Sequence, residues 1–117
     1  MANYLMALDR MFLALGDPTR RAIVSRLANG AATVKELAAP FTMALPSFMK
    51  HLGVLERSGL IRSHKQGRIR TCELQPAALR GVEAWLADQQ AIWEARTDRL
   101  AAYVEALHHK ETTHGRR

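Results

Sequence analysis

The sequence predicts a mainly α-helical fold with a small β-hairpin, and three observations support this prediction. Apolar residues recur at helical spacing in several segments that glycine and proline residues separate. Two short runs compatible with β-strands flank the pair Gln66-Gly67. The segment that begins at Pro76 repeats apolar residues every seven positions, which predicts a long last helix.

The first two helices are delimited by strong local signals. A helix over about residues 4–15 ends before Gly16, and its apolar positions are Leu5, Leu8, Phe12 and Leu15. Asp17-Pro18 then starts a second helix, because aspartate accepts a hydrogen bond at the N-cap and proline suits the first helical position. Asn29-Gly30 ends this helix.

Two further helices follow, a short one and a longer one. Thr33 and Glu36 have the spacing of a capping box, and Pro40 limits the helix that they start. Pro46 opens the next helix, which runs to about Arg57, before Ser58-Gly59. Its shared buried face is expected to consist of Phe48, Leu52 and Leu55.

The C-terminal half is expected to contain the hairpin and the long helix. The predicted strands are residues 60–65 and 68–74, with a turn at Gln66-Gly67. The seven-residue repeat in the last helix consists of Leu79, Leu86, Trp93, Leu100 and Leu107. Part of this row is expected to form a homodimer interface, although packing within one chain is the alternative explanation.

Length and composition favour one domain. The chain has 117 residues, of which 48% are hydrophobic, so we expect a single domain over residues 1–108 and a flexible tail over residues 109–117. Its single cysteine, Cys72, excludes an intrachain disulfide and fits a cytoplasmic protein. No stretch reaches the roughly 20 apolar residues that span a bilayer, so no membrane association is expected.

Positive charge is concentrated in the fourth helix and the hairpin. Between Leu45 and Arg70 the chain has six basic side chains and one acidic side chain, Glu56, while the formal net charge of the whole chain is +6. An amphipathic helix followed by a basic ribbon matches the major and minor grooves of DNA. The predicted partner is therefore double-stranded DNA.

The order of the elements is that of a winged helix-turn-helix, in which the fourth helix reads DNA and the hairpin is the wing. Three segments carry a specific resemblance to a known family: FLALGDPTRRAIVSRLANG, TVKELAAPF and LPSFMKHLGVLERSGLIRSHKQGRIRTCEL. In this order they closely resemble the ArsR-type, or arsenical-resistance repressor, family of transcriptional regulators. The later segment WLADQQAIWEARTDRLAAYV resembles the C-terminal dimerisation helix of one branch of that family.

This resemblance implies a homodimeric repressor that binds an inverted repeat in DNA. It places Ser47, Lys50 and His51 on the reader helix and Arg68 and Arg70 on the wing. Thr33 and Lys35 belong to a helix whose start lies near phosphate in family members.

Two of these reader positions have alternative explanations. Met49 departs from the small hydroxyl residue that is frequent at its position, and it either packs on a thymine methyl group or covers a neighbouring side chain. His51 lies beside the buried row, so a core or hydrogen-bonding role competes with DNA contact.

The dimer interface is expected to include Leu5, Leu8, Phe12, Leu86, Trp93, Leu100 and Tyr103.

Other functional classes have less support in the sequence. The third helix lacks cysteine, and Asp98 is not followed two residues later by the histidine that the family's zinc-type site requires, so neither a metal nor a cofactor is expected. Ser47 and His51 lack an acidic partner, so we expect no enzymatic activity. The alternatives are a metal-responsive or small-ligand-responsive sensor of the same family and a winged-helix module that binds an acidic protein surface.

Overall fold

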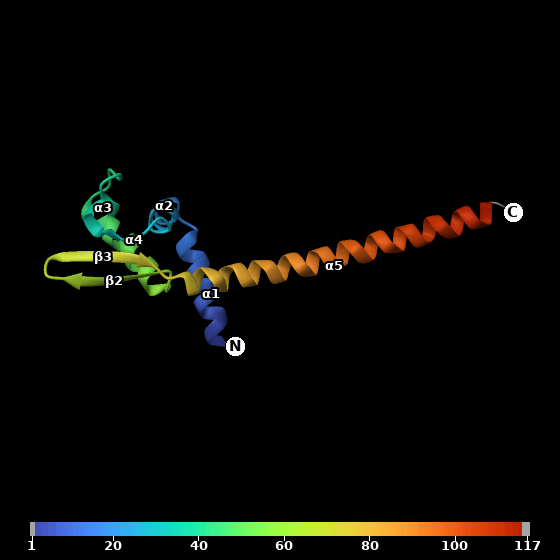
Figure 1. The fold of residues 1–117 in the computed structure, drawn as a ribbon, viewed down its shortest axis with the longest axis horizontal. Helices are drawn as coiled ribbons and strands as arrows, with labels where there is room; N and C mark the ends of the chain where they lie inside the picture. Colours follow the sequence, from blue (N-terminus) through green and yellow to red (C-terminus); the bar gives the residue numbers. More distant parts are fainter. Residues whose placement is uncertain (1, 116–117) are drawn as a thin grey trace. The chain divides into compact units, whose positions relative to one another are not determined.

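A computed structural model describes residues 2–115, and the side chains of residues 5–112. Figure 1 shows its elements, which are α1 (Ala2–Leu15), α2 (Pro18–Leu27), β1 (Ala32–Thr33), α3 (Val34–Ala38), α4 (Leu45–Arg57), β2 (Ile61–Gln66), β3 (Ile69–Leu74) and α5 (Pro76–Gly115). The predicted mainly helical fold with a β-hairpin is thereby confirmed.

The chain forms two compact units, one ending at Val82 and one beginning at Glu83, where the sequence suggested a single domain over residues 1–108. The second unit is the greater part of α5. This helix continues to Gly115, so residues 109–115, which we expected in a flexible tail, are helical. Lys110 and Glu111 favour the helical conformation, and the remaining residues of this segment continue the preceding long helix. Residues 116–117 lie outside the described part of the chain.

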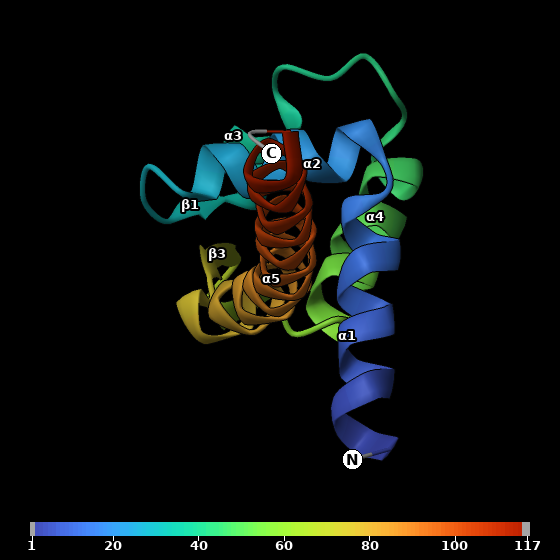
Figure 2. The same ribbon diagram turned by 90° about the vertical axis from the view of Figure 1, so that its right-hand side faces the viewer.

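The first unit is built around one apolar core beneath α4. Phe48, Leu52 and Leu55 are all buried, as their spacing predicted, and they pack with Ile23, Leu37, Leu60 and Cys72. The two helices α1 and α4 run side by side at the edge of this core (Figure 2). Because one face of α4 is buried in the core, its opposite face is left to solvent.

The local capping signals act as the sequence predicted. The Asp17 side chain accepts a hydrogen bond from the backbone N–H of Arg20 at the start of α2. At the start of α3, the Thr33 hydroxyl oxygen and the Glu36 carboxylate each accept a hydrogen bond from the other residue's backbone N–H, at 3.1 Å. These backbone hydrogen bonds hold the pKa of both Asp17 and Glu36 below the ordinary range of a carboxyl group.

The sheet differs from the prediction in two details. A third, two-residue strand, β1, pairs with β3 through Ala32–Cys72 and Thr33–Thr71, which gives an antiparallel sheet in the order β1-β3-β2. The hairpin turn lies one residue later than expected, at Gly67-Arg68, because Gln66 pairs with Ile69. Gly67 has a φ of 64°, the left-handed conformation that a two-residue hairpin turn demands at its first central position.

One predicted interface residue belongs to the core instead. Leu8 is only 4% exposed within a single chain, whereas Leu5 on the same helix is 53% exposed. The prediction that Leu8 contacts a second protomer is therefore wrong. Leu5 and Phe12 stay exposed and accessible to a partner.

We expect Leu8→Ala to lower the free energy of unfolding by about 2–4 kcal/mol, because it removes a buried side chain and leaves a cavity. Leu13→Ala is the matched control on the same helix, since Leu13 is 72% exposed and should contribute less than about 0.5 kcal/mol. Urea denaturation of the two variants at equal protein concentration measures the difference. Similar losses in both variants would show that Leu8 is not a core residue.

Candidate nucleic-acid interface

A basic cleft lies where α3, α4 and the wing, the β2–β3 hairpin, come together. It has a volume of about 580 Å³, and its walls comprise Thr33, Val34, Lys35, Met49, Lys65, Arg68, Ile69 and Arg70. Four of these side chains are cationic and none is acidic. Such a cleft attracts a polyanion and leaves room for its backbone between the helix and the wing.

The structure brings together five of the eight residues that we predicted to contact DNA. Thr33, Lys35, Met49, Arg68 and Arg70 all line the cleft. Ser47 and Lys50 are both exposed on α4 but do not line the cleft. Helix α4 therefore presents polar and cationic side chains to solvent while its apolar face stays in the core.

The wing is fastened to the end of α4 by a short polar chain. The Ser63 hydroxyl donates to Oε1 of Glu56 at 2.6 Å, and Nε of Arg70 donates to the Ser63 hydroxyl oxygen at 3.1 Å. The second carboxylate oxygen of Glu56 lies 4.0 Å from the Arg70 guanidinium. Arg70 thus has a structural contact as well as a place in the cleft, whereas Arg68 sits in the turn, beyond this chain of contacts.

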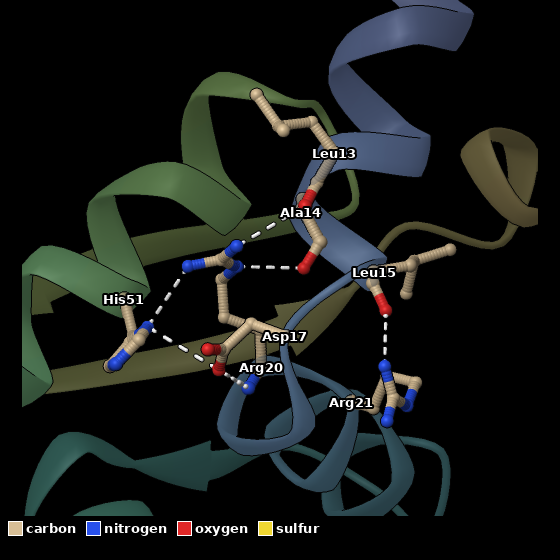
Figure 3. Close-up of polar contacts among 7 residues, drawn as sticks. All are labelled: Leu13, Ala14, Leu15, Asp17, Arg20, Arg21 and His51. Atoms are coloured by element: carbon tan, nitrogen blue, oxygen red, sulfur yellow. Dashed lines mark hydrogen bonds and ion pairs between the residues drawn. The ribbon is translucent and has the colours of Figure 1, made fainter.

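His51 takes part in a polar cluster that joins three helices (Figure 3). Nη1 of Arg20 donates to Nδ1 of His51 at 3.1 Å, and the same ring nitrogen is 3.7 Å from Asp17. Arg20 also donates to the carbonyl oxygens of Ala14 and Leu13 at 2.7 and 3.2 Å. Among the two explanations that the sequence left open, the hydrogen-bonding one describes this histidine, and we assign it to positioning α4.

Two arginines of α2 join this helix to the end of α1. Arg20 and Arg21 both donate to carbonyl oxygens at the C-terminus of α1. Arg21 makes one such hydrogen bond, to Leu15 at 2.9 Å, from an exposed position. A helix C-terminus carries partial negative charge, which a guanidinium satisfies well.

Sequence reasoning missed three lining residues of the cleft, Val34, Lys65 and Ile69. Lys65 pairs directly with Arg70 across the hairpin, which places both side chains on the same face of the wing. The signal for this pairing was Gly67, because a turn that begins at the glycine sets the observed register. The predicted turn, one residue earlier, would have paired Lys65 with Arg68 instead.

Other chemistries receive little support from the described part of the chain. No group of three or more His, Cys, Asp or Glu side chains there is placed to hold a metal ion. Burial raises the pKa of the Cys72 thiol, which disfavours the reactive thiolate. No helix among residues 2–115 has the length and apolar character needed to cross a membrane.

We expect Arg20→Ala to reduce the free energy of unfolding by about 2 kcal/mol, because it removes part-buried hydrogen bonds to the Ala14 carbonyl of α1 and to the His51 ring of α4. Arg21→Ala, which removes one exposed hydrogen bond, is the control and should cost less than about 0.5 kcal/mol. Chemical denaturation compares the two. If both substitutions have equally small effects, the cluster around Arg20 does not hold the helices together.

Comparison with known proteins agrees with this geometry. The model of a helix-turn-helix domain family matches residues 15–64. The HTH-type transcriptional regulator Rv2034 of Mycobacterium tuberculosis is 36% identical over 99 residues, which cover 85% of this chain and 87% of that protein. The transcriptional repressor SdpR of Bacillus subtilis is 30% identical over 79 residues, which cover 68% of this chain and 88% of that protein.

Solved structures point the same way. The crystal structure of an ArsR family transcriptional regulator is 61% identical to this chain, with a TM-score of 0.73, and the match covers 75% of this chain and 97% of that one. The order of helices and wing, the basic cleft and these relatives lead to one conclusion. The chain belongs to the ArsR family of winged helix-turn-helix transcriptional regulators and is a DNA-binding regulator of transcription.

Proposed function

We propose that this protein is a homodimeric repressor that binds an inverted-repeat operator in double-stranded DNA. The observation that carries the proposal is the basic cleft between α4 and the wing, in which Lys35, Lys65, Arg68 and Arg70 gather. The solvent face of α4 enters the major groove, and the wing follows the adjacent backbone or minor groove. Such a protein acts in the cytoplasm, where it needs neither a cofactor nor catalytic chemistry.

Each group of side chains has a distinct part in this binding. Lys50 and Ser47 reach base edges or phosphates from the exposed face of α4. Arg68, in the turn of the wing, has the greatest reach toward the backbone or a narrow minor groove. Lys35 and Thr33 approach phosphate at the start of α3. Cationic side chains that contact DNA phosphates supply affinity, while contacts to bases supply sequence preference.

The second unit supplies the surface for dimerisation. Every side chain of residues 83–112 is exposed in a single chain. Leu86, Trp93, Leu100, Val104 and Leu107 are 45–64% exposed. At about 100° per residue these five side chains fall on one side of the helix. An apolar row of this length is characteristic of a surface that a second protein covers. Leu5, Phe12 and Tyr103 are the other exposed residues that we assign to the interface.

A dimer also explains how one small domain recognises an operator. One reader helix and one wing bury little DNA surface, whereas two copies related by a two-fold axis double the contacts. The two copies of α4 would occupy major grooves about 34 Å apart, one turn of DNA. Occupation of such a site in a promoter blocks transcription. Repression is the activity named for the relative from Bacillus subtilis, which supports this proposal.

Arg68→Ala should weaken binding to specific and random duplexes alike by about 1 kcal/mol and reduce the slope of log K against log salt by about one unit. Arg62→Ala is the matched control, because it removes the same charge from the same hairpin. Arg62 donates to Glu73 instead of lining the cleft. Fluorescence anisotropy at several salt concentrations measures both variants. Equal effects of the two substitutions would remove the wing turn from the DNA-binding surface.

Trp93→Glu should convert the dimer to a monomer and strongly weaken operator binding, because it places a charge in the middle of the apolar row. Ala95→Glu adds the same charge about 200° away around the helix and should leave the dimer intact. Sedimentation velocity at micromolar concentration distinguishes these outcomes. Trp93 is 64% exposed, so the variant should fold. A monomeric wild type that binds the full operator would contradict the dimeric mechanism.

A further inference from the structure

The first turn of α4 presents an unusual apolar pair to solvent beside the basic cleft. Leu45, the first residue of the helix, is 59% exposed. Met49 is half-buried, packs against the core on one side and lines the cleft on the other. Residues four apart are neighbours on a helix surface, so the two side chains lie on the same side of α4, and we call them the apolar patch. Large apolar side chains at a DNA-binding surface call for a functional explanation, because they neither attract phosphate nor hydrogen-bond to a base.

The position of the patch selects its occupant. Residues near the N-terminus of a reader helix are those that reach base edges when the helix enters the major groove. Lys35 and Arg68 line the same cleft as Met49, and Lys50 is the next, exposed residue of the helix, so positive charge lies near the patch. This charge favours a polyanion over an apolar protein surface. The patch is therefore directed at bases, while its cationic neighbours are directed at the phosphates on either side.

We propose that Leu45 and Met49 read thymine by contact with the methyl groups that thymine displays in the major groove. The C5-methyl group of thymine is the apolar feature that distinguishes one base pair from another on the major-groove edge. A leucine and a flexible methionine provide van der Waals surface for it and exclude water from it. The inference rests on the proposed DNA-binding function and adds the chemical feature of the operator that α4 recognises.

The inference separates selectivity from affinity within one surface. The cations of the cleft bind phosphates of any sequence, so they set the salt dependence of binding. The apolar pair senses the methyl groups, which carry no charge. Loss of a methyl group should therefore weaken binding while the salt dependence stays the same.

The experiment begins with duplexes that the wild-type protein selects from a random library. Each thymine of a selected duplex is then replaced in turn by deoxyuridine, which lacks only the methyl group. We expect binding to weaken by about fourfold for each methyl group that the patch buries, at one or two positions in each half-site. The slope of affinity against salt should be unchanged at those positions.

Variants assign the effect to the two side chains. Leu45→Ala and Met49→Ala should each abolish the preference for thymine over deoxyuridine at one of the sensitive positions. Leu13→Ala is the control, because Leu13 is a 72% exposed leucine on α1 that does not line the cleft. It should keep the full preference at every position. Thermal denaturation of all three variants confirms that they are folded.

Two results would overturn the inference. One is equal affinity of the wild type for thymine and deoxyuridine at every position of a tightly bound duplex. The other is an unchanged preference for thymine in both the Leu45→Ala and Met49→Ala variants. In either case salt-dependent, sequence-selective binding by the wild type would leave the proposed DNA-binding function standing. A wild type that selects no duplex would overturn the proposed function as well.

Discussion

Burial of one face of α4 is the interaction on which the whole site depends. Phe48, Leu52 and Leu55 are between 0 and 1% exposed, and together they fix the rotation of α4 about its own axis. A rotation of the helix by a single residue position, about 100°, would carry Lys50 away from the surface beside the cleft. The hydrophobic core therefore decides which side chains are offered to DNA.

Polar contacts fix the position of α4 relative to the elements around it. The cluster of Arg20, His51 and Asp17 joins α4 to the start of α2 and the end of α1. Glu56 and Ser63 join the end of α4 to the wing. The middle of α4 is thus tied through Arg20 to α1, which contributes Leu5 and Phe12 to the proposed dimer interface, and the C-terminal end of α4 is tied to the hairpin. In a dimer, these contacts would transmit the spacing of the two protomers to the spacing of their reader helices.

The sequence predicted the features that depend on local chemistry. Caps at Asp17 and Thr33 and the buried face of α4 follow from spacing within one or two helical turns, and the structure confirms them. Features that depend on contacts distant in sequence were missed. Arg20 and His51, which form a hydrogen bond, are 31 residues apart. The two-residue strand β1 forms because β3 provides a strand for it to pair with. Local pattern contains no information about either pairing.

Periodicity also cannot say how much of an apolar face another element covers. Leu5 and Leu8 share one spacing pattern, yet the rest of the chain covers Leu8 and leaves Leu5 exposed. The wing shows a similar limit, since a shift of one residue in the turn changes which side chains share its faces. The candidate site was therefore predictable as a region, but its lining residues Lys65 and Ile69 required the actual register.

The most direct test of the DNA-binding surface is to follow the backbone amide resonances of the protein by NMR while a selected operator duplex is added. The account predicts that the largest shifts fall in three segments, namely the start of α3, the N-terminal half of α4 and the turn of the wing at residues 65–70. Amides of Ile23 and Leu55 in the core should shift little. If the largest shifts instead map outside these three segments, the assignment of the basic cleft and α4 as the DNA-reading surface is wrong.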